Sequence, residues 1–185
     1  MRADGARMMS AMPRGAIFPL LVAALVAAAA ALPGCGLGRE QERVTAQAGA
    51  QQEGRVERVV DGDTVIVDLD SGARERVRLI GIDTPESVKP GTPVQCFALK
   101  ASGFTKHLLT GRRVRLVLDA EPRDKYDRLL AYVYRLPDNL FVNAELVRLG
   151  YAQTLTIPPN VRFADRFGAL ARQARDTSRG LWGSC

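Results

Sequence analysis

The chain has 185 residues, of which 46% are hydrophobic and 25% charged, and its formal net charge is +6 at pH 7. This length allows one ordinary domain with extra segments, and the composition excludes a chain that is disordered throughout. The positive net charge suits a polyanionic partner without requiring one. The sequence has a single histidine, His107, which excludes catalytic mechanisms that need two histidines.

The N-terminal segment resembles an export signal. Its positive charges are three arginines ahead of an apolar stretch: Arg2, Arg7 and Arg14. The stretch, residues 16–33, is uncharged and leads to Cys35, an order similar to bacterial lipoprotein signals, in which the cysteine is lipidated. We therefore predict a lipoprotein-type signal peptide over residues 1–34, a lipid on Cys35, and an exported protein anchored to the membrane of the bacterial cell envelope. Ordinary cleavage nearby, giving a secreted or periplasmic soluble protein, and an uncleaved alanine-rich anchor are the alternatives.

The next segment is a predicted tether. Residues 35–54 are rich in glutamine, alanine, glutamate and glycine and contain almost no large apolar side chain, so they cannot build a core. The folded domain is expected to span residues 55–185. Within it, Cys96 and Cys185 form an even pair in an oxidising compartment, which predicts a disulfide; two unrelated thiols are the alternative.

The hydrophobic pattern of the domain predicts five strands and three helices. The strands are residues 55–60, 64–69, 73–81, 112–119 and 128–135. The helices are residues 96–109, residues 142–150, and a last segment that places Phe163, Phe167, Leu170 and Ala174 on one face. This order predicts an α+β, mainly β fold, a five-stranded OB-fold barrel with three helices. Barrel closure rests on the strand count, so a mixed open sheet is the alternative.

Arg78 stands out because it interrupts the apolar run from Val77 to Ile82. A guanidinium buried among such neighbours costs roughly several kcal/mol unless an anion meets it. Asp83 or Glu86 is expected to supply that anion, or else a ligand does.

Four motifs in the domain carry a resemblance to a known family. They are DGDTV at 61–65, VRLIGIDTPE at 77–86, DKYDRLLAYVY at 124–134 and VNAELVRLGYA at 142–152. Their order and approximate spacing resemble the staphylococcal nuclease (thermonuclease) family over about residues 55–183. The resemblance implies a Ca²⁺-dependent nuclease that hydrolyses DNA and RNA, with single-stranded or frayed substrates preferred, and leaves 3′-phosphates.

The resemblance also implies a metal site and a catalytic set. Asp63, Asp83 and the backbone carbonyl of Thr84 would bind Ca²⁺, with waters and the substrate phosphate completing its shell of 6 to 8 oxygens. Asp61 matches a nearby acid of the family and is expected to support the site rather than to ligate.

The catalytic set implied by the resemblance is Arg78, Glu86 and Arg128. The two arginines would face the scissile phosphate, because guanidinium groups bind phosphate oxygens bidentately. Glu86 would act on the attacking water, as general base or by positioning it. A structural ion pair between Arg78 and Glu86, and a solvated strand-end charge at Arg128, are the alternatives.

Substrate binding is assigned by resemblance to Lys125, beside a terminal phosphate, and to Tyr126, beside the base, although Tyr126 could equally be a packing residue. Asp127 replaces a glycine of the family, and aspartate tolerates a left-handed conformation. Thr156 and Pro158 stand where many relatives carry a pair of tyrosines. Stacking contributes roughly 1–3 kcal/mol per base, so we predict weaker nucleotide binding.

The leading hypothesis is therefore an exported, membrane-tethered, Ca²⁺-dependent nuclease that acts as a monomer. Two alternatives belong to other classes: a catalytically silent OB-fold module that only binds nucleic acid, and a lipoprotein whose barrel serves protein contacts or envelope structure. A digest with Ca²⁺ or chelator would discriminate between them.

Overall fold

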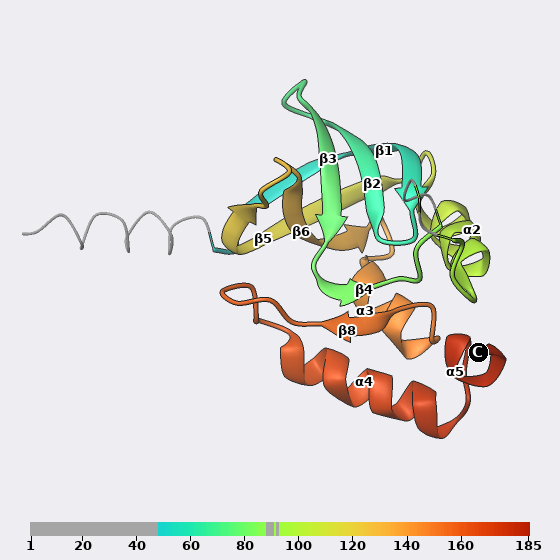
Figure 1. The fold of residues 1–185 in the computed structure, drawn as a ribbon. Helices are drawn as coiled ribbons and strands as arrows, with labels where there is room; N and C mark the ends of the chain where they lie inside the picture. The colour runs from blue at the N-terminus through green and yellow to red at the C-terminus, as the bar shows by residue number, and fades with distance from the viewer. Residues whose placement is uncertain (1–47, 88–90, 92) are drawn as a thin grey trace, which may run out of the picture. The chain divides into compact units, whose positions relative to one another are not determined.

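The computed structural model describes residues 48–87, 91 and 93–185 (Figure 1). The predicted signal peptide, Cys35 and most of the predicted tether lie outside these residues. In the described part of the chain, no helix has the length and apolar character that crossing a membrane would require.

Five long strands form a closed barrel. They are β1 (Gln51–Asp61), β2 (Thr64–Leu69), β3 (Arg74–Leu79), β5 (Arg113–Arg123) and β6 (Leu129–Arg135). They pair antiparallel in the order β3-β2-β1-β5-β6, with the short β7 (Leu140–Phe141) beside β6, and β3 also pairs in parallel with β6. That last pairing closes the barrel, so the predicted OB-type barrel is confirmed and the open sheet is excluded.

The first strand begins four residues before Arg55, where the sequence pattern places its start. Gln51–Arg55 pairs antiparallel with Arg113–Val117 of β5. Backbone N–H and C=O groups make these bonds, so the polar side chains of the segment do not prevent pairing. Residues 51–54, predicted as tether, are therefore part of the barrel.

The third predicted strand is broken in two. β3 ends at Leu79, and after a turn a separate strand, β4 (Gly81–Asp83), pairs with β8 (Gln153–Leu155). Gly81 has a φ of +78°, and a Cβ at this position would lie 2.4 Å from a ring carbon of Phe167. Both the backbone angle and the close approach require glycine at the break.

Three helices pack around the barrel, as predicted, and a short fourth follows. They are α2 (Ala98–Leu109), α3 (Val142–Arg148), α4 (Ala164–Asp176) and α5 (Leu181–Ser184). α2 contacts β1, and α3 contacts both β6 and α4 (Figure 1). Phe97, expected in the first helix, instead precedes it with a φ of +69° and packs with Tyr151.

The core comes from the alternation of the barrel strands. Completely buried side chains on these strands include Val56, Val65, Val67, Val77, Leu79, Val114 and Leu116. Each fully buried aliphatic side chain stabilises the fold by roughly 1.5–3 kcal/mol, which makes the barrel a rigid support for groups at its rim.

The predicted disulfide between Cys96 and Cys185 is present in the structure, with the two Cα atoms 6.0 Å apart. It joins the segment before α2 to the end of α5. Because it closes a loop across 89 residues, it restricts the unfolded chain, a stabilisation of roughly 4–5 kcal/mol in the loop-entropy account.

Candidate active site

A polar pocket of about 350 Å³ lies where the ends of β1, β2 and β3 meet the loop after β4. Its charged and hydroxyl-bearing lining residues are Asp61, Asp63, Thr64, Arg76, Arg78, Asp83, Thr84, Glu86 and Arg128. Every residue that the resemblance assigns to catalysis or to the metal is among them. Groups up to 67 positions apart in the sequence, Asp61 and Arg128, therefore share one pocket.

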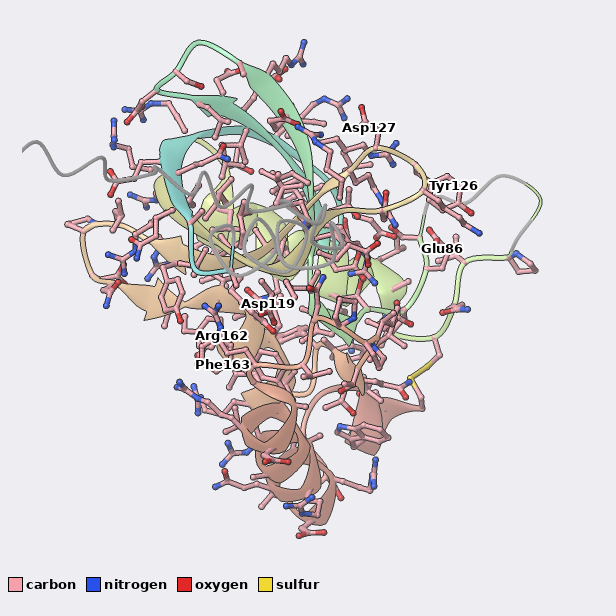
Figure 2. The ribbon with its side chains drawn as sticks, turned by 90° about the vertical axis from the view of Figure 1, so that its left-hand side faces the viewer. Glu86, Asp119, Tyr126, Asp127, Arg162 and Phe163 are labelled. Atoms are coloured by element: carbon pink, nitrogen blue, oxygen red, sulfur yellow. A yellow bond between two sulfur atoms is a disulfide. The ribbon has the colours of Figure 1, made fainter. Side chains whose placement is uncertain are left out.

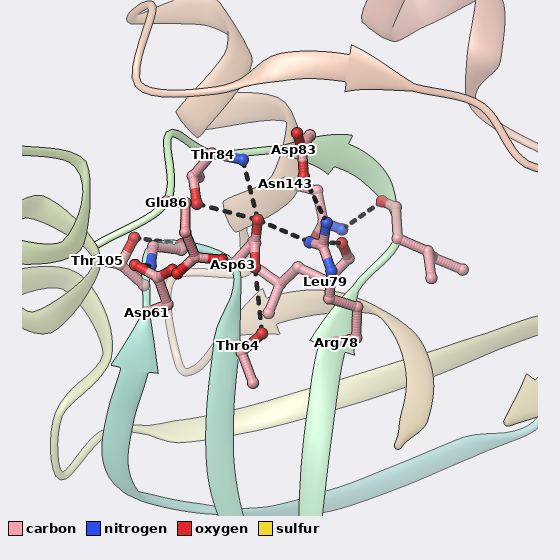
Figure 3. A network of polar contacts seen from close by, with 12 residues as sticks. Asp61, Asp63, Thr64, Arg78, Leu79, Asp83, Thr84, Glu86, Thr105 and Asn143 are labelled. Carbon is pink, nitrogen blue, oxygen red and sulfur yellow. Dashed lines mark hydrogen bonds and ion pairs between the residues drawn. The ribbon is translucent and has the colours of Figure 1, made fainter. Parts of the chain in front are cut away.

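Asp63 accepts hydrogen bonds on both of its carboxylate oxygens. It lies in the turn between β1 and β2, and its side chain is only 9% exposed. One oxygen accepts from the Thr64 hydroxyl at 3.1 Å; the other accepts from the Thr84 N–H and hydroxyl, both at 2.9 Å (Figure 3). These bonds fix the carboxylate in the pocket and tie the β1–β2 turn to the end of β4.

Arg78 bridges two acids. Its Nη1 lies 2.9 Å from Asp63 Oδ2, its Nη2 lies 2.9 Å from Asp83 Oδ1, and Nη1 also donates to the carbonyl of Leu79 at 3.1 Å. The guanidinium is only 13% exposed, so both carboxylates stabilise a charge that would otherwise be costly to bury. Asp83 was one of the expected anions, whereas Asp63 was not.

Asp61 anchors the other side of the pocket. Its Oδ1 accepts from the Gly62 N–H at 2.8 Å and from the Ser87 hydroxyl at 2.6 Å. Burial raises the pKa of Asp61; the bonds from Ser87 and Gly62 oppose the rise, and Glu86 and Asp63 add to it. The supporting role expected for Asp61 stays a prediction.

Asp83 is also affected by its surroundings. Burial raises its pKa, Arg78 lowers it, and the neighbouring carboxylates of Asp63 and Glu86 raise it further, with a net rise. Negative charge is thus crowded in this pocket, and a cation placed among the acids would favour their ionised forms.

The donor chemistry of the pocket fits Ca²⁺. The available side-chain ligands are carboxylates and hydroxyls, the oxygen donors that hard cations prefer. No three acidic, histidine or cysteine side chains within residues 48–87, 91 and 93–185 are grouped as a complete metal cluster. The predicted Ca²⁺ ligands, Asp63, Asp83 and the Thr84 carbonyl, therefore stay a prediction.

Arg128 reaches the pocket from the turn before β6. Its Nε donates to Asp124 Oδ2 at 2.7 Å, and its backbone N–H donates to Asp124 Oδ1 at 3.0 Å. Burial alone would raise the pKa of Asp124, but these bonds outweigh burial and lower it. Asp124, which sequence reasoning did not single out, is therefore the residue that orients Arg128.

Tyr126 and Lys125 lie beside Arg128. The Tyr126 side chain is 69% exposed, which excludes a core packing role. The Lys125 ammonium and the Arg128 guanidinium lie 5.1 and 5.5 Å from the centre of its ring. Figure 2 places this loop on the same side of the domain as Glu86. Asp127, with a φ of +60°, adopts the left-handed conformation expected where the family has glycine.

A second hollow, of about 160 Å³, adjoins the pocket and is mostly apolar. Its lining includes Arg78 and Arg128 together with apolar side chains such as Leu79, Leu155 and Ile157. Thr156 and Pro158 are in the same exposed segment, residues 155–159.

The segment after β8 is fastened to β5 at its far end. Asn160 exchanges two hydrogen bonds with the backbone of Glu121, at 2.8 and 2.9 Å. Asp119 accepts from the Tyr132 hydroxyl at 2.8 Å and from the Arg162 N–H at 3.2 Å (Figure 2). The loop that borders the apolar hollow is therefore held in place by the barrel.

Several positioning residues were not predicted from the sequence, and Asn143 is a fully buried one. Its side chain has no exposed surface; Nδ2 donates to the Ile80 carbonyl at 2.9 Å, and Oδ1 accepts from the Val133 N–H at 2.9 Å. It thereby fastens the turn between β3 and β4 to β6. The sequence does contain a signal for Asn143, because a polar asparagine on the apolar face of a predicted helix indicates a buried hydrogen-bonding role.

Two further contacts hold the acidic loops. The Thr105 hydroxyl of α2 donates to the Gly62 carbonyl at 2.7 Å. The Gln95 side chain accepts from the Glu86 N–H at 2.8 Å, and the Gln95 N–H donates to the Glu86 carbonyl at 3.0 Å. The position of Glu86 is thus set from both its backbone groups.

Replacing Asn143 with alanine is expected to destabilise the domain and to lower its activity. The change leaves a buried carbonyl and a buried N–H without their partner, at a cost of roughly 1–3 kcal/mol for each group. Urea unfolding measures the loss, with Gln173→Ala on the exposed side of α4 as the control. An Asn143→Ala protein as stable as this control would contradict the positioning role.

Comparisons with known proteins agree with this arrangement. A family model described as "Staphylococcal nuclease homologue" matches residues 76–184. The chain is 50% identical to a thermonuclease of Staphylococcus intermedius over 127 residues, covering 69% of this chain and 74% of that protein. It is 43% identical to a thermonuclease of Staphylococcus hyicus over 132 residues, covering 71% and 76% of the two chains. Endonuclease YncB of Bacillus subtilis is 35% identical over 129 residues, covering 69% of this chain and 60% of that protein.

Proposed function

Because the chain belongs to the staphylococcal nuclease family and is a nuclease, we propose that it hydrolyses phosphodiester bonds of DNA and RNA with Ca²⁺ and leaves 3′-phosphate ends. The observation that carries the proposal is the meeting of three acids, Asp63, Asp83 and Glu86, with Arg78 and Arg128 in one pocket. A binding module would not need this combination of acids and guanidinium groups.

The arginines are placed to bind the reacting phosphate. A guanidinium has five N–H groups, and the three contacts of Arg78 use three of them. The remaining donors can hold a phosphate oxygen while the acids keep the side chain in position. Arg128, oriented by Asp124, faces the same space. Charge on phosphorus oxygens grows in the transition state, where each such donor contributes roughly 3 kcal/mol.

Glu86 is the base or positioning residue for the attacking water. Its backbone N–H and C=O are both held by Gln95, so this segment needs little reorganisation during the reaction. Ca²⁺, held by Asp63, Asp83 and the Thr84 carbonyl, would neutralise phosphate charge when bound.

A digest tests the function. Single-stranded DNA, plasmid and RNA are incubated with Ca²⁺ or with a chelator, and product ends are identified by mass spectrometry. Cutting in Ca²⁺ that stops in chelator and leaves 3′-phosphates is expected. Full-rate cutting in chelator would contradict the metal assignment, and DNA binding without cutting would favour the silent OB-fold module.

Nucleotide binding is expected to be weaker than in relatives that carry two tyrosines at the positions of Thr156 and Pro158. The hollow next to Arg78 offers Leu155 and Ile157 rather than aromatic rings, and each lost stacking contact costs roughly 1–3 kcal/mol. The Michaelis constant on single-stranded DNA measures this. A value equal to that of a tyrosine-bearing relative would contradict the prediction.

We also propose that the nuclease is exported and lipid-anchored at Cys35, and that it works as a monomer. The disulfide between Cys96 and Cys185 supports export, because such bonds persist in oxidising compartments. Mass spectrometry of the mature N-terminus tests the lipid directly.

A further inference from the structure

Arg76 is a charged residue at the active site to which the proposed reaction gives no role. It lies on β3, opposite Ile66 of β2, and its side chain is exposed. It lines the catalytic pocket and also a neighbouring hollow of about 400 Å³, whose other lining residues are Glu86, Tyr126 and Arg128. Arg76 therefore stands where the catalytic pocket opens toward the exposed ring of Tyr126.

The geometry of β3 places Arg76 in line with the catalytic arginine. Side chains alternate along a strand, so Arg74, Arg76 and Arg78 share one face, with roughly 7 Å between successive positions. Arg74 forms an ion pair with Glu57, and Arg78 is held by Asp63 and Asp83.

The guanidinium of Arg76 differs from its neighbours on β3 in having no acidic partner among the described residues. Among the described residues, no carboxylate lies within ion-pair distance of its guanidinium, in contrast to the arginines on either side of it along the same face. An arginine at the mouth of a pocket with no internal partner is suited to bind an anion that comes with the substrate.

The spacing between Arg76 and Arg78 along β3 indicates what that anion is. Alternate residues of a β-strand are roughly 7 Å apart, a spacing that suits neighbouring phosphates of an extended single strand. With one phosphate on Arg78, the neighbouring phosphate would lie near Arg76. Exposed aromatic rings beside such a backbone track accept bases, and Tyr126 lies across the same hollow.

We propose that Arg76 binds the phosphate next to the scissile one, so that the site selects a polynucleotide over a single nucleotide. This rests on the proposed function, since it takes the phosphate at Arg78 as the one that is cut. The hollow between Arg76 and Tyr126 is then the path by which the strand leaves the catalytic pocket.

The test compares substrates of different length. Arg76→Ala is assayed on a dinucleotide and on a 12-nucleotide single strand, with Arg76→Lys as the conservative variant and Arg172→Ala, on the exposed side of α4, as the matched control. We expect kcat/KM on the 12-mer to fall roughly tenfold, mainly through KM, as for the loss of one charge-assisted hydrogen bond. The loss on the dinucleotide should be clearly smaller, and lysine should restore most of the difference. Equal losses on both substrates, or no loss on the 12-mer, would overturn the proposal.

Binding gives an independent readout. In the Glu86→Gln background, fluorescence anisotropy with a labelled 12-mer yields the slope of log affinity against log salt. Removing one phosphate contact should reduce this slope by roughly 0.7 for Arg76→Ala, and Arg172→Ala should keep it. An unchanged slope for Arg76→Ala would overturn the assignment even if the protein cuts DNA. A wild-type protein that cuts neither substrate would overturn the proposed reaction, while the slope would still decide the role of Arg76.

Discussion

Replacing Glu86 with glutamine is expected to lower the cleavage rate on single-stranded DNA by roughly 10²- to 10⁴-fold, the contribution of a general base. Glutamine has nearly the same size and can hydrogen-bond Asp61, and Gln95 holds the backbone at this position independently of the side chain. The fold should therefore stay intact, and the loss should appear in kcat. Single-turnover kinetics at saturating DNA, together with thermal unfolding, measure both quantities.

The matched control for this change is Glu121→Gln. Glu121 is an exposed carboxylate on β5, outside the catalytic pocket, and the substitution removes the same charge. If Glu86→Gln cut DNA within tenfold of this control, Glu86 would be a structural acid, and the water would have to be activated elsewhere.

Arg128→Lys is expected to lower kcat by roughly 10²- to 10³-fold while changing KM less. Lysine keeps the positive charge but cannot offer two parallel N–H groups to a phosphate and, at the same time, an Nε–H to Asp124. The loss therefore falls on an interaction that is strongest in the transition state. Steady-state kinetics on single-stranded DNA separates the two constants.

Arg148→Lys is the control for this second prediction, because Arg148 also pairs with an acid close in sequence, Glu145, but on α3 and outside the pocket. It should retain activity. An Arg128→Lys enzyme with an unchanged kcat would show that this position needs only charge, and the proposed bidentate contact would be wrong.

The barrel strands could be predicted because each one has a hydrophobic pattern within its own segment of sequence. Apolar alternation in the segments that became β2, β5 and β6 marks buried strands, and turn residues separate them. The start of the first strand was predicted at Arg55, four residues after its observed start. Gln51–Arg55 pairs through backbone hydrogen bonds, which do not require any particular type of side chain. The break at Gly81 was missed for a related reason: the ring of Phe167 that demands it lies 86 positions away.

Only the identity of the site residues could be predicted from the sequence motifs. The four motifs named the residues, but their mutual contacts depend on strand register. Thr64 lies opposite Arg78 in the β2–β3 pairing, and this brings Asp63 against the guanidinium. Asp83 and Glu86 were the nearer candidates in sequence, so Asp63 was not considered as a partner. The role of Asn143 could not be predicted because its two hydrogen-bond partners are backbone groups distant or separate from its helix, one in the β3–β4 turn and one on β6.

Isothermal titration calorimetry measures most directly whether the acids of this pocket hold Ca²⁺ together with a phosphate, as we propose. Ca²⁺ is titrated into the wild-type domain and into Asp63→Asn, each with and without a non-hydrolysable nucleotide analogue. The account predicts one Ca²⁺ per wild-type chain, tighter uptake with the analogue, and loss of uptake in a folded Asp63→Asn. No Ca²⁺ uptake by the wild type with the analogue present, or equal uptake by Asp63→Asn, would contradict it.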